Sequence, residues 1–178
     1  LLGKSGQDMM LSNGETTQVL ELKEAEQRFS FTGIEEKPIP SLLRSFSAPV
    51  KLHYAYQRDD LVFLMSHDSD GFNRWEAAQK LGVDILQELI GEYQAGNELV
   101  LDNRLTAAYR AVLTDLSLDQ AMVSKVLTLP TEAYLSELSD IIDVDAIHAV
   151  REFVIKTLAE ALSSELVAAY DRCNVSEK

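Results

Sequence analysis

Three histidines, His53, His67 and His148, are the side chains best suited to bind a metal ion or to transfer protons near neutral pH. A zinc site needs two ligands on adjacent turns of one helix face with a third nearby, but these histidines belong to three separate segments. His148 and Glu152 are four residues apart, a spacing typical of a surface contact on a helix. We therefore expect no metal-ligating residues in this chain.

The stretch Ser66–Gly71 (SHDSDG) begins like a calcium-binding loop, with acidic residues at alternate positions and glycine sixth. The twelfth position of such a loop requires a bidentate glutamate, and here it is Ala77. The stretch is better interpreted as a turn between helices. Asp70 is then predicted to cap the helix that follows.

Other candidates for chemistry lack the context that each would need. Gly3-Lys4-Ser5 has no second glycine five residues earlier, so it does not predict a phosphate-binding loop. Cys173 has no histidine beside it in sequence that would mark it as a nucleophile, and no Gly-x-Ser-x-Gly motif occurs. We expect no catalytic and no cofactor-binding residues, and no cofactor bound by this chain.

The composition excludes several classes of partner. The 178 residues carry 16 Lys+Arg and 29 Asp+Glu, a net charge of -13, which opposes binding to nucleic acids or to anionic membrane surfaces. No apolar run approaches the roughly 18 residues of a membrane span. One cysteine and the lack of a secretory signal pattern predict a cytoplasmic protein. Because the chain starts on two leucines, we expect it to be a piece of something longer.

The first part of the chain, residues 1–55, is predicted to be β-rich. It holds three of the four prolines, and its apolar residues alternate with polar ones over 16–23, 27–31 and 50–54. Such strands have one wet face, as in antiparallel sheets and sandwiches. A few short strands make a thin sheet, so we expect part of a β-sandwich with exposed edges through which two copies could associate.

The second part, residues 56–178, is predicted to be an all-α stack of antiparallel helices. Apolar patterns with a period of 3.6 predict two helices over 72–93 and 104–113. A third is predicted to start at a capping box at 117–120 and to end just before Pro130. A short fourth helix should follow Thr131. A long final helix should begin at a cap on Asp143 and run to near the chain end. Together the two parts predict an α+β fold.

An aromatic stripe on these helices leaves two interpretations open. At helical spacing such residues are usually core, which we favour, but they could instead line a ligand groove. The residues concerned are Trp75, Tyr93, Tyr109 and Tyr134.

Several stretches together resemble the bacterial aminopeptidase N family, the zinc-dependent alanyl aminopeptidases of the gluzincin class. The similarity extends over essentially all 178 residues. It is carried by Pro38–Leu52 (PIPSLLRSFSAPVKL), Leu64–His67, Phe72–Gln79 (FNRWEAAQ), Tyr109–Leu113, Leu127–Pro130 and Asp140–Asp143.

The resemblance implies a place for this chain in a larger enzyme. Members of the family have an N-terminal β domain, a thermolysin-like zinc domain, a small β-sandwich and a helical domain that closes over the active site. By resemblance, residues 1–55 are the later strands of the small sandwich and residues 56–178 are the first helices of the helical domain. The family's zinc motif and its Gly-x-Met-Glu-Asn motif have no matching positions here.

Two function hypotheses follow. The first is a non-catalytic accessory region of a zinc aminopeptidase, inactive alone, with the zinc held in the parent polypeptide. Its partners would be the catalytic domain of the same polypeptide and the peptide substrates of the parent. The alternative is a helical-repeat scaffold that binds another protein and has no enzymatic parent. A His-Glu-x-x-His motif upstream of Leu1 would decide for the first.

Overall fold

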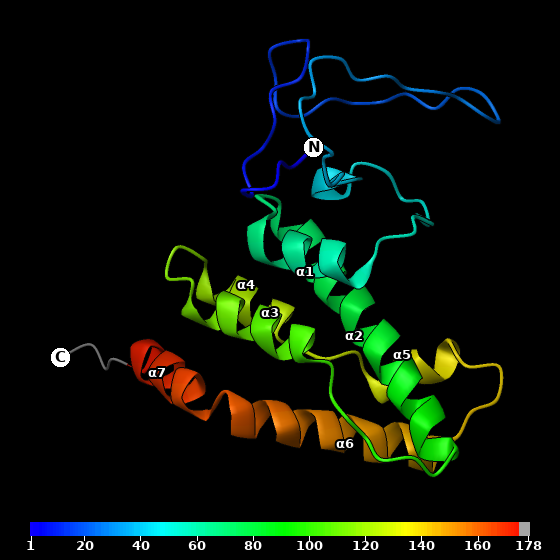
Figure 1. The fold of residues 1–178 in the computed structure, drawn as a ribbon, viewed down its shortest axis with the longest axis vertical. Helices are drawn as coiled ribbons and strands as arrows, with labels where there is room; N and C mark the ends of the chain where they lie inside the picture. Colours follow the sequence, from blue (N-terminus) through cyan, green and yellow to red (C-terminus); the bar gives the residue numbers. More distant parts are fainter. Residues whose placement is uncertain (175–178) are drawn as a thin grey trace.

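The computed structural model describes residues 1–174 and shows a mostly helical molecule (Figure 1). An irregular N-terminal segment lies at one end, and the longest helix, α2, leads away from it toward α6 at the other end. The described elements are the 3-10 turn η1 (Arg44–Phe46) and the helices α1 (Arg58–His67), α2 (Gly71–Gln94), α3 (Asn103–Thr114), α4 (Gln120–Val126), α5 (Glu132–Glu137), α6 (Val144–Ala161) and α7 (Ser163–Cys173).

The core is built around α2, whose buried side chains face α1, α4 and α6. Its spacing of apolar residues at three and four positions explains this, because it gives the helix one broad apolar face. The largest fully buried side chains on the helices include Leu81, Ile85, Leu86, Leu105, Leu135 and Ile147. No helix among residues 1–174 is long and apolar enough to cross a membrane.

The predicted starts of α2 and α3 are correct to within one residue, whereas no range was predicted for α1. Asp70 and Asp143 each accept a hydrogen bond from the backbone N–H three residues later, so these two predicted caps are confirmed. Thr131, after which a short helix was predicted, caps α5 in the same way. The capping box at 117–120 is wrong in its register. Asp119 caps α4 by accepting from the N–H of Met122, at 3.0 Å.

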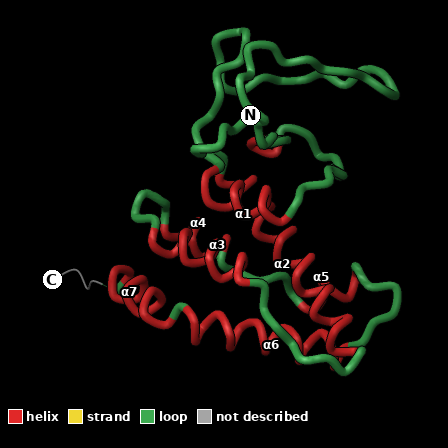
Figure 2. Tube along the Cα trace, in the orientation of Figure 1, coloured by secondary structure: helices red, strands yellow, loops and turns green. Residues whose placement is uncertain are grey.

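The expected β-sandwich is not found in the structure. Within the described chain, no β-strand occurs, and the segment before α1 holds only two isolated bridges, from Leu2 to Asp8 and to Ile39 (Figure 2). The stretches 16–23, 27–31 and 50–54 run as extended or irregular chain. Most of their alternating apolar side chains are exposed, such as Leu22 at 69% and Val50 at 60%. Leu52 is an exception, because it is partly buried beside α1 and α2. A sheet of few strands is not stable without a second layer.

The long final helix predicted from Asp143 is divided into two. Helix α6 ends at Ala161 and α7 begins at Ser163, with Leu162 between them in a non-helical conformation (φ -118°, ψ 16°). No glycine or proline marks this break. Two serines, Ser163 and Ser164, follow the break directly.

Candidate functional site

The three histidines have surface positions. His53 and His67 are exposed, and Nδ1 of His148 lies 2.8 Å from Oε1 of Glu132 rather than pairing with Glu152. That contact raises the pKa of His148 above its ordinary value of 6.5. Among residues 1–174, no group of three or more His, Cys, Asp or Glu side chains could hold a metal ion.

The Ser66–Gly71 stretch forms the corner between α1 and α2. Asp68 is fully buried there, and its Oδ1 accepts a hydrogen bond of 2.9 Å from the N–H of Asp70. The same oxygen lies 3.5 Å from the guanidinium of Arg44, while Oδ2 has no hydrogen-bond partner. Burial, the largest influence, raises the pKa of Asp68. The corner is thus a structural turn, as expected.

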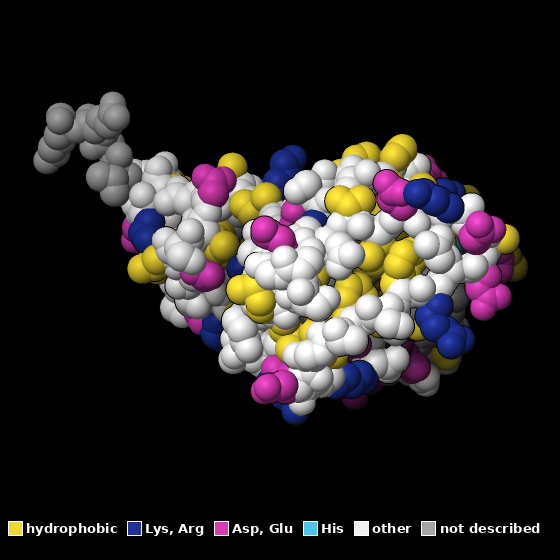
Figure 3. Space-filling view, turned by 90° about the horizontal axis from the view of Figure 1, so that it is seen from above, with side chains coloured by type: hydrophobic (Ala, Val, Ile, Leu, Met, Phe, Trp, Pro, Cys, Tyr) yellow, Lys and Arg dark blue, Asp and Glu magenta, His cyan; other side chains and the backbone are white. Residues whose placement is uncertain are grey.

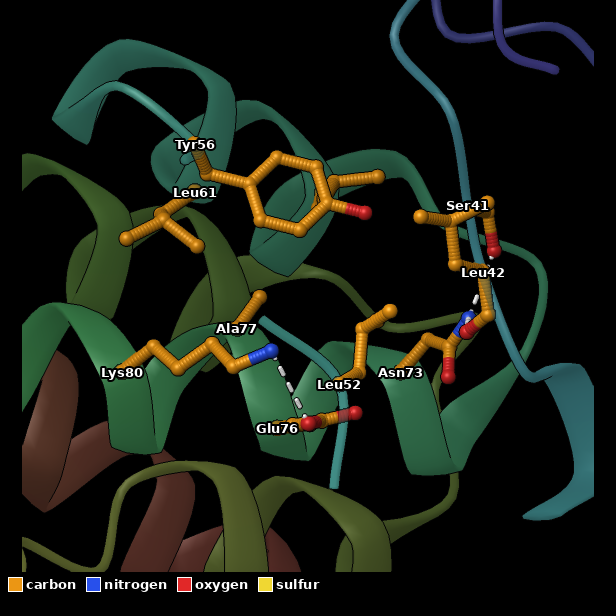
Figure 4. A pocket seen from close by; sticks show the side chains of 10 residues that line it. Ser41, Leu42, Leu52, Tyr56, Leu61, Asn73, Glu76, Ala77 and Lys80 are labelled. Atoms are coloured by element: carbon orange, nitrogen blue, oxygen red, sulfur yellow. Dashed lines mark hydrogen bonds and ion pairs between the residues drawn. The ribbon is translucent and has the colours of Figure 1, made fainter. Parts of the chain in front are cut away.

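The corner also anchors the N-terminal segment. Nδ2 of the buried Asn73 donates to Oγ of Ser41 at 2.7 Å and to the carbonyl of Leu42 at 2.9 Å. Nearby, the hydroxyl of Tyr56 donates to the carbonyl of Pro40 at 2.7 Å. These bonds attach residues 40–42 to the start of the helical part (Figure 4).

Strained backbone follows at η1. Leu43, Ser45 and Phe46 have φ values of 55°, 55° and 52°, a region that non-glycine residues rarely adopt. Asp70 holds this conformation, because its Oδ2 accepts from the backbone N–H of Ser45 at 2.8 Å. The ring of Phe46 also packs edge-on against Phe72, with the centroids 5.4 Å apart. Surrounding contacts of this kind are needed to maintain such strain.

A groove between α2 and α5 is the largest cavity described, with a volume of about 670 Å³. Its floor and walls are largely apolar and aromatic, which is the usual character of binding sites for organic ligands and peptides. We call it the α2–α5 groove. It is lined by Phe72, Trp75, Glu76, Gln79, Lys80, Val83, Asp84, Gln87, Thr131, Tyr134 and Leu138.

One charged pair separates this groove from a small cavity of about 10 Å³. Nζ of Lys80 lies 3.0 Å from Oε1 of Glu76 and 5.6 Å from the ring centroid of Tyr56 (Figure 4). Both side chains project from α2 between the two cavities. The ammonium group of Lys80 therefore interacts with both the Glu76 carboxylate and the Tyr56 ring. Lys80 and Glu76 thus already satisfy each other's charge without a ligand.

A second charged cluster joins α1 to α2 and to the start of α3. Arg58 donates to Asp84 at 2.5 Å, to Asp102 at 3.0 Å and to Glu88. Asp102 also binds Arg104, and this bond, as the largest influence, lowers the pKa of Asp102. Sequence spacing gave no sign of this network, because its members come from three separate segments. The Arg58 network links α1, α2 and the start of α3 to one another.

The aromatic stripe divides between the two interpretations left open by the sequence. Tyr109 is 5% exposed and belongs to the core, as expected. Trp75 is only partly buried and lines the groove together with Tyr134, and Tyr93 is exposed. The core assignment is therefore wrong for Tyr93 and Tyr134, which are both 44% exposed, whereas Trp75 packs against the core and also lines the groove.

The remaining candidates do not assemble into a site. Sγ of the exposed Cys173 lies 2.9 Å from Oε1 of Gln120. The Gly3-Lys4-Ser5 stretch lies in the irregular N-terminal segment. On the face seen from the N-terminal end, apolar side chains reach the surface among scattered charges of both signs (Figure 3). Cys173 and Gln120 both line a second cavity, of about 530 Å³, which is bounded mainly by residues of α4 and α7.

Comparisons with known proteins divide the chain in two. Residues 1–55 match a family model described as a domain of unknown function, DUF3458, with an Ig-like fold. Residues 58–178 match one described as a domain of unknown function, DUF3458_C, with ARM repeats.

Individual relatives are aminopeptidases. Over 159 residues, the chain is 43% identical to Aminopeptidase N of Escherichia coli, covering 89% of this chain and 18% of that protein. It is 35% identical over 170 residues to Aminopeptidase N of Haemophilus influenzae, covering 95% of this chain and 20% of that protein. The chain thus spans about a fifth of the length of the curated relatives it matches.

A solved structure, Legionella pneumophila aminopeptidase A in complex with aspartic acid, has a TM-score of 0.67 to this chain and 36% sequence identity. The match covers 82% of this chain and 17% of that one. Identity at this level over most of the chain confirms the resemblance to aminopeptidase N seen in the sequence. With two thirds of its residues inside one family model, the chain belongs to the DUF3458_C family, described as ARM repeats.

Proposed function

We propose that this chain is a non-catalytic accessory region of a zinc-dependent aminopeptidase that removes N-terminal amino acids from peptides. The observation that carries the proposal is the 43% identity to an aminopeptidase over 89% of the chain. Identity with enzymes over that length favours an enzymatic parent over a free-standing scaffold built from the same kind of repeat.

The helical part, in this proposal, helps to enclose the active-site cavity of the parent. The geometry that supports this role is the α2–α5 groove, whose lining combines aromatic and apolar side chains with the Glu76–Lys80 ion pair, Asp84 and uncharged polar groups. Such a surface can contact peptide side chains or the catalytic domain without contributing a reactive group. The catalytic domain of the same polypeptide and the peptide substrates are the proposed partners.

Zinc belongs to the parent and not to this region. The described residues do not fit a zinc site, because no three candidate ligands come together among residues 1–174. We therefore assign this chain no step in the reaction and expect it to be inactive by itself. A cytoplasmic location is part of the proposal, since a single cysteine requires no oxidising compartment.

The test compares the full-length gene product with the present chain. The full-length protein should contain a His-Glu-x-x-His motif, hydrolyse an aminoacyl reporter substrate and lose that activity on treatment with a chelator. The isolated chain should show no turnover and retain no stoichiometric zinc after dialysis. A full-length product without the motif or without activity would overturn the enzymatic parent, and turnover by the repurified chain would overturn the accessory role.

The groove has its own test within the full-length protein. Trp75→Ala should change KM for a peptide of several residues more than KM for a single-residue reporter, if the groove lies on the substrate path. Tyr93→Ala is the matched control, because Tyr93 is exposed on the same helix but does not line the groove. Equal kinetic constants for all three proteins would exclude a role of the groove in substrate binding.

A further inference from the structure

The break between α6 and α7 is not explained by local sequence. Residues 144–173 contain neither glycine nor proline and continue one apolar pattern across Leu162. On the near side of the break, the N–H of Leu162 still donates to the carbonyl of Leu158 at 2.9 Å. On the far side, the N–H of Leu166 donates to the carbonyl of Leu162 at 2.9 Å. The regular helix of α6 nevertheless ends at Ala161, and that of α7 begins at Ser163.

A side chain from α3 occupies the position that a continuous helix would need. Nη2 of Arg110 donates to the carbonyl of Ala161 at 2.8 Å, and Nε donates to Oε1 of Glu165 at 2.6 Å. In an uninterrupted helix the carbonyl of Ala161 would accept from the N–H of Glu165 instead. Arg110 thus takes the place of Glu165 as the donor to the carbonyl of Ala161. It also binds the side-chain carboxylate of Glu165.

Helix α7 is otherwise held mainly by polar contacts. It has no buried residue, and three of its apolar side chains, Leu166, Val167 and Tyr170, are 40%, 60% and 68% exposed. At its far end, Nη2 of Arg172 donates to the carbonyl of Leu113 in α3 at 3.0 Å. Ala169 packs partly against the core. Among residues 1–174, α7 therefore buries little apolar surface against the other helices.

We propose that Leu162 is a pivot with two states. In the bent state described here, Arg110 clamps the end of α6 to the first turn of α7. In the straight state, the clamp is open and α6 and α7 form one continuous helix that regains the missing backbone hydrogen bonds. Burial of Leu162, which is 1% exposed, and the Arg110 contacts favour the bent state.

Two spin labels can measure the bend. Glu152→Cys and Asp171→Cys place the labels on exposed positions of α6 and α7, in a Cys173→Ser background that keeps a hydroxyl near Gln120. A continuous helix would separate these two positions by about 28 Å, from a rise of roughly 1.5 Å per residue. The bent state should give a shorter distance by pulsed electron paramagnetic resonance.

Opening the clamp should lengthen this distance. Arg110→Gln should raise the ratio of straight to bent molecules by roughly tenfold, as expected for the loss of a charge-assisted hydrogen bond. Glu165→Gln, which leaves the bond to Ala161 in place, should have a smaller effect in the same direction. Lys156→Gln removes one exposed positive charge from α6 without touching the clamp and should change nothing.

Changing the salt concentration tests the Arg110 contacts independently of mutation. At about 1 M NaCl, where the screening length is about 3 Å, the wild-type distance should move toward the straight state, while Arg110→Gln should respond little. Far-ultraviolet circular dichroism should show helix content unchanged or slightly raised in Arg110→Gln, which separates straightening from unfolding. A bent distance that persists in both clamp variants would overturn the proposal, as would a straight wild type. If Arg110→Gln unfolds, Glu165→Gln alone decides in the same way.

Discussion

The ring of Pro130 lies against Gly82, and a β-carbon added to Gly82 would be only 2.9 Å from its Cδ and 3.2 Å from its Cγ. Gly82 is buried in the middle of α2, and Pro130 precedes α5. The absence of a side chain at residue 82 therefore lets the connection between α4 and α5 approach α2 closely. This approach fixes the position of α5 and hence one wall of the groove.

Gly82→Ala should destabilise the protein. Overpacking typically costs roughly 1 to 3 kcal/mol, and the better helix propensity of alanine returns at most about 1 kcal/mol. Gly91→Ala is the matched control, since it lies in the same helix with nothing within 4 Å of its added β-carbon. That variant should be stabilised by up to about 1 kcal/mol. Urea unfolding of both proteins measures the difference, and equal midpoints would refute the close approach.

The contact between His148 and Glu132 predicts a measurable titration. Its hydrogen bond raises the pKa of His148 above 6.5, so the contact with protonated histidine is present below that pH and is lost as the pH rises through the raised pKa. Glu132→Gln should move the pKa back toward 6.5, as followed by the ring-proton signals in nuclear magnetic resonance. Glu152→Gln should have the smaller effect. The opposite order would mean that the neighbour along α6 is the true partner.

Trp75 should contribute less to stability than a fully buried tryptophan. Because its side chain is half-buried at the groove wall, Trp75→Ala should lower the free energy of unfolding by roughly 1 to 3 kcal/mol, below the 3 to 5 typical of core aromatics. Urea titration followed by circular dichroism gives the value. A loss at the upper end of the core range would support the full core assignment made from the stripe.

Residues 16–31 should exchange their amide hydrogens faster than residues 72–93. The first stretch has no strand pairing in the structure, whereas the second lies within α2, whose inner face is buried. Hydrogen exchange of a dilute sample tests this directly. Protection of 16–31 that appears only at high concentration would indicate association of two copies through this segment. Equal, strong protection in a strictly monomeric sample would contradict the structure.

Local signals in the sequence predicted most of the helical part. Caps such as Asp70 and Asp143 act on backbone groups three residues away, so composition and spacing are enough to find them. The break at Leu162 could not be found in this way, because Arg110 is 51 residues from the carbonyl it binds. The strands predicted for residues 1–55 had a related limit: this part matches a family model with an Ig-like fold, yet none of its described stretches forms a strand. Alternation predicts which face of a strand would be buried, but it does not supply the layer that buries it.

The sequence identified aromatic residues of the candidate groove but not their arrangement around it. Trp75 and Tyr134 were recognised as aromatic positions on helices, yet their meeting across α2 and α5 depends on the close approach of Pro130 to Gly82. Glu76 and Lys80, four residues apart on one helix, carried a spacing that signals an ion pair. The i,i+4 spacing of Glu76 and Lys80 could therefore have been used to predict the position of these two groove residues.

The corner at residues 68–70 implies an order of folding. Because only three residues separate α1 from α2, pairing these two helices closes a very short loop and loses little chain entropy. Arg44, Ser41 and Leu42 bind Asp68 and Asn73, two side chains that the α1–α2 corner brings together. The N-terminal segment is therefore expected to become ordered last, using the helical part as its template.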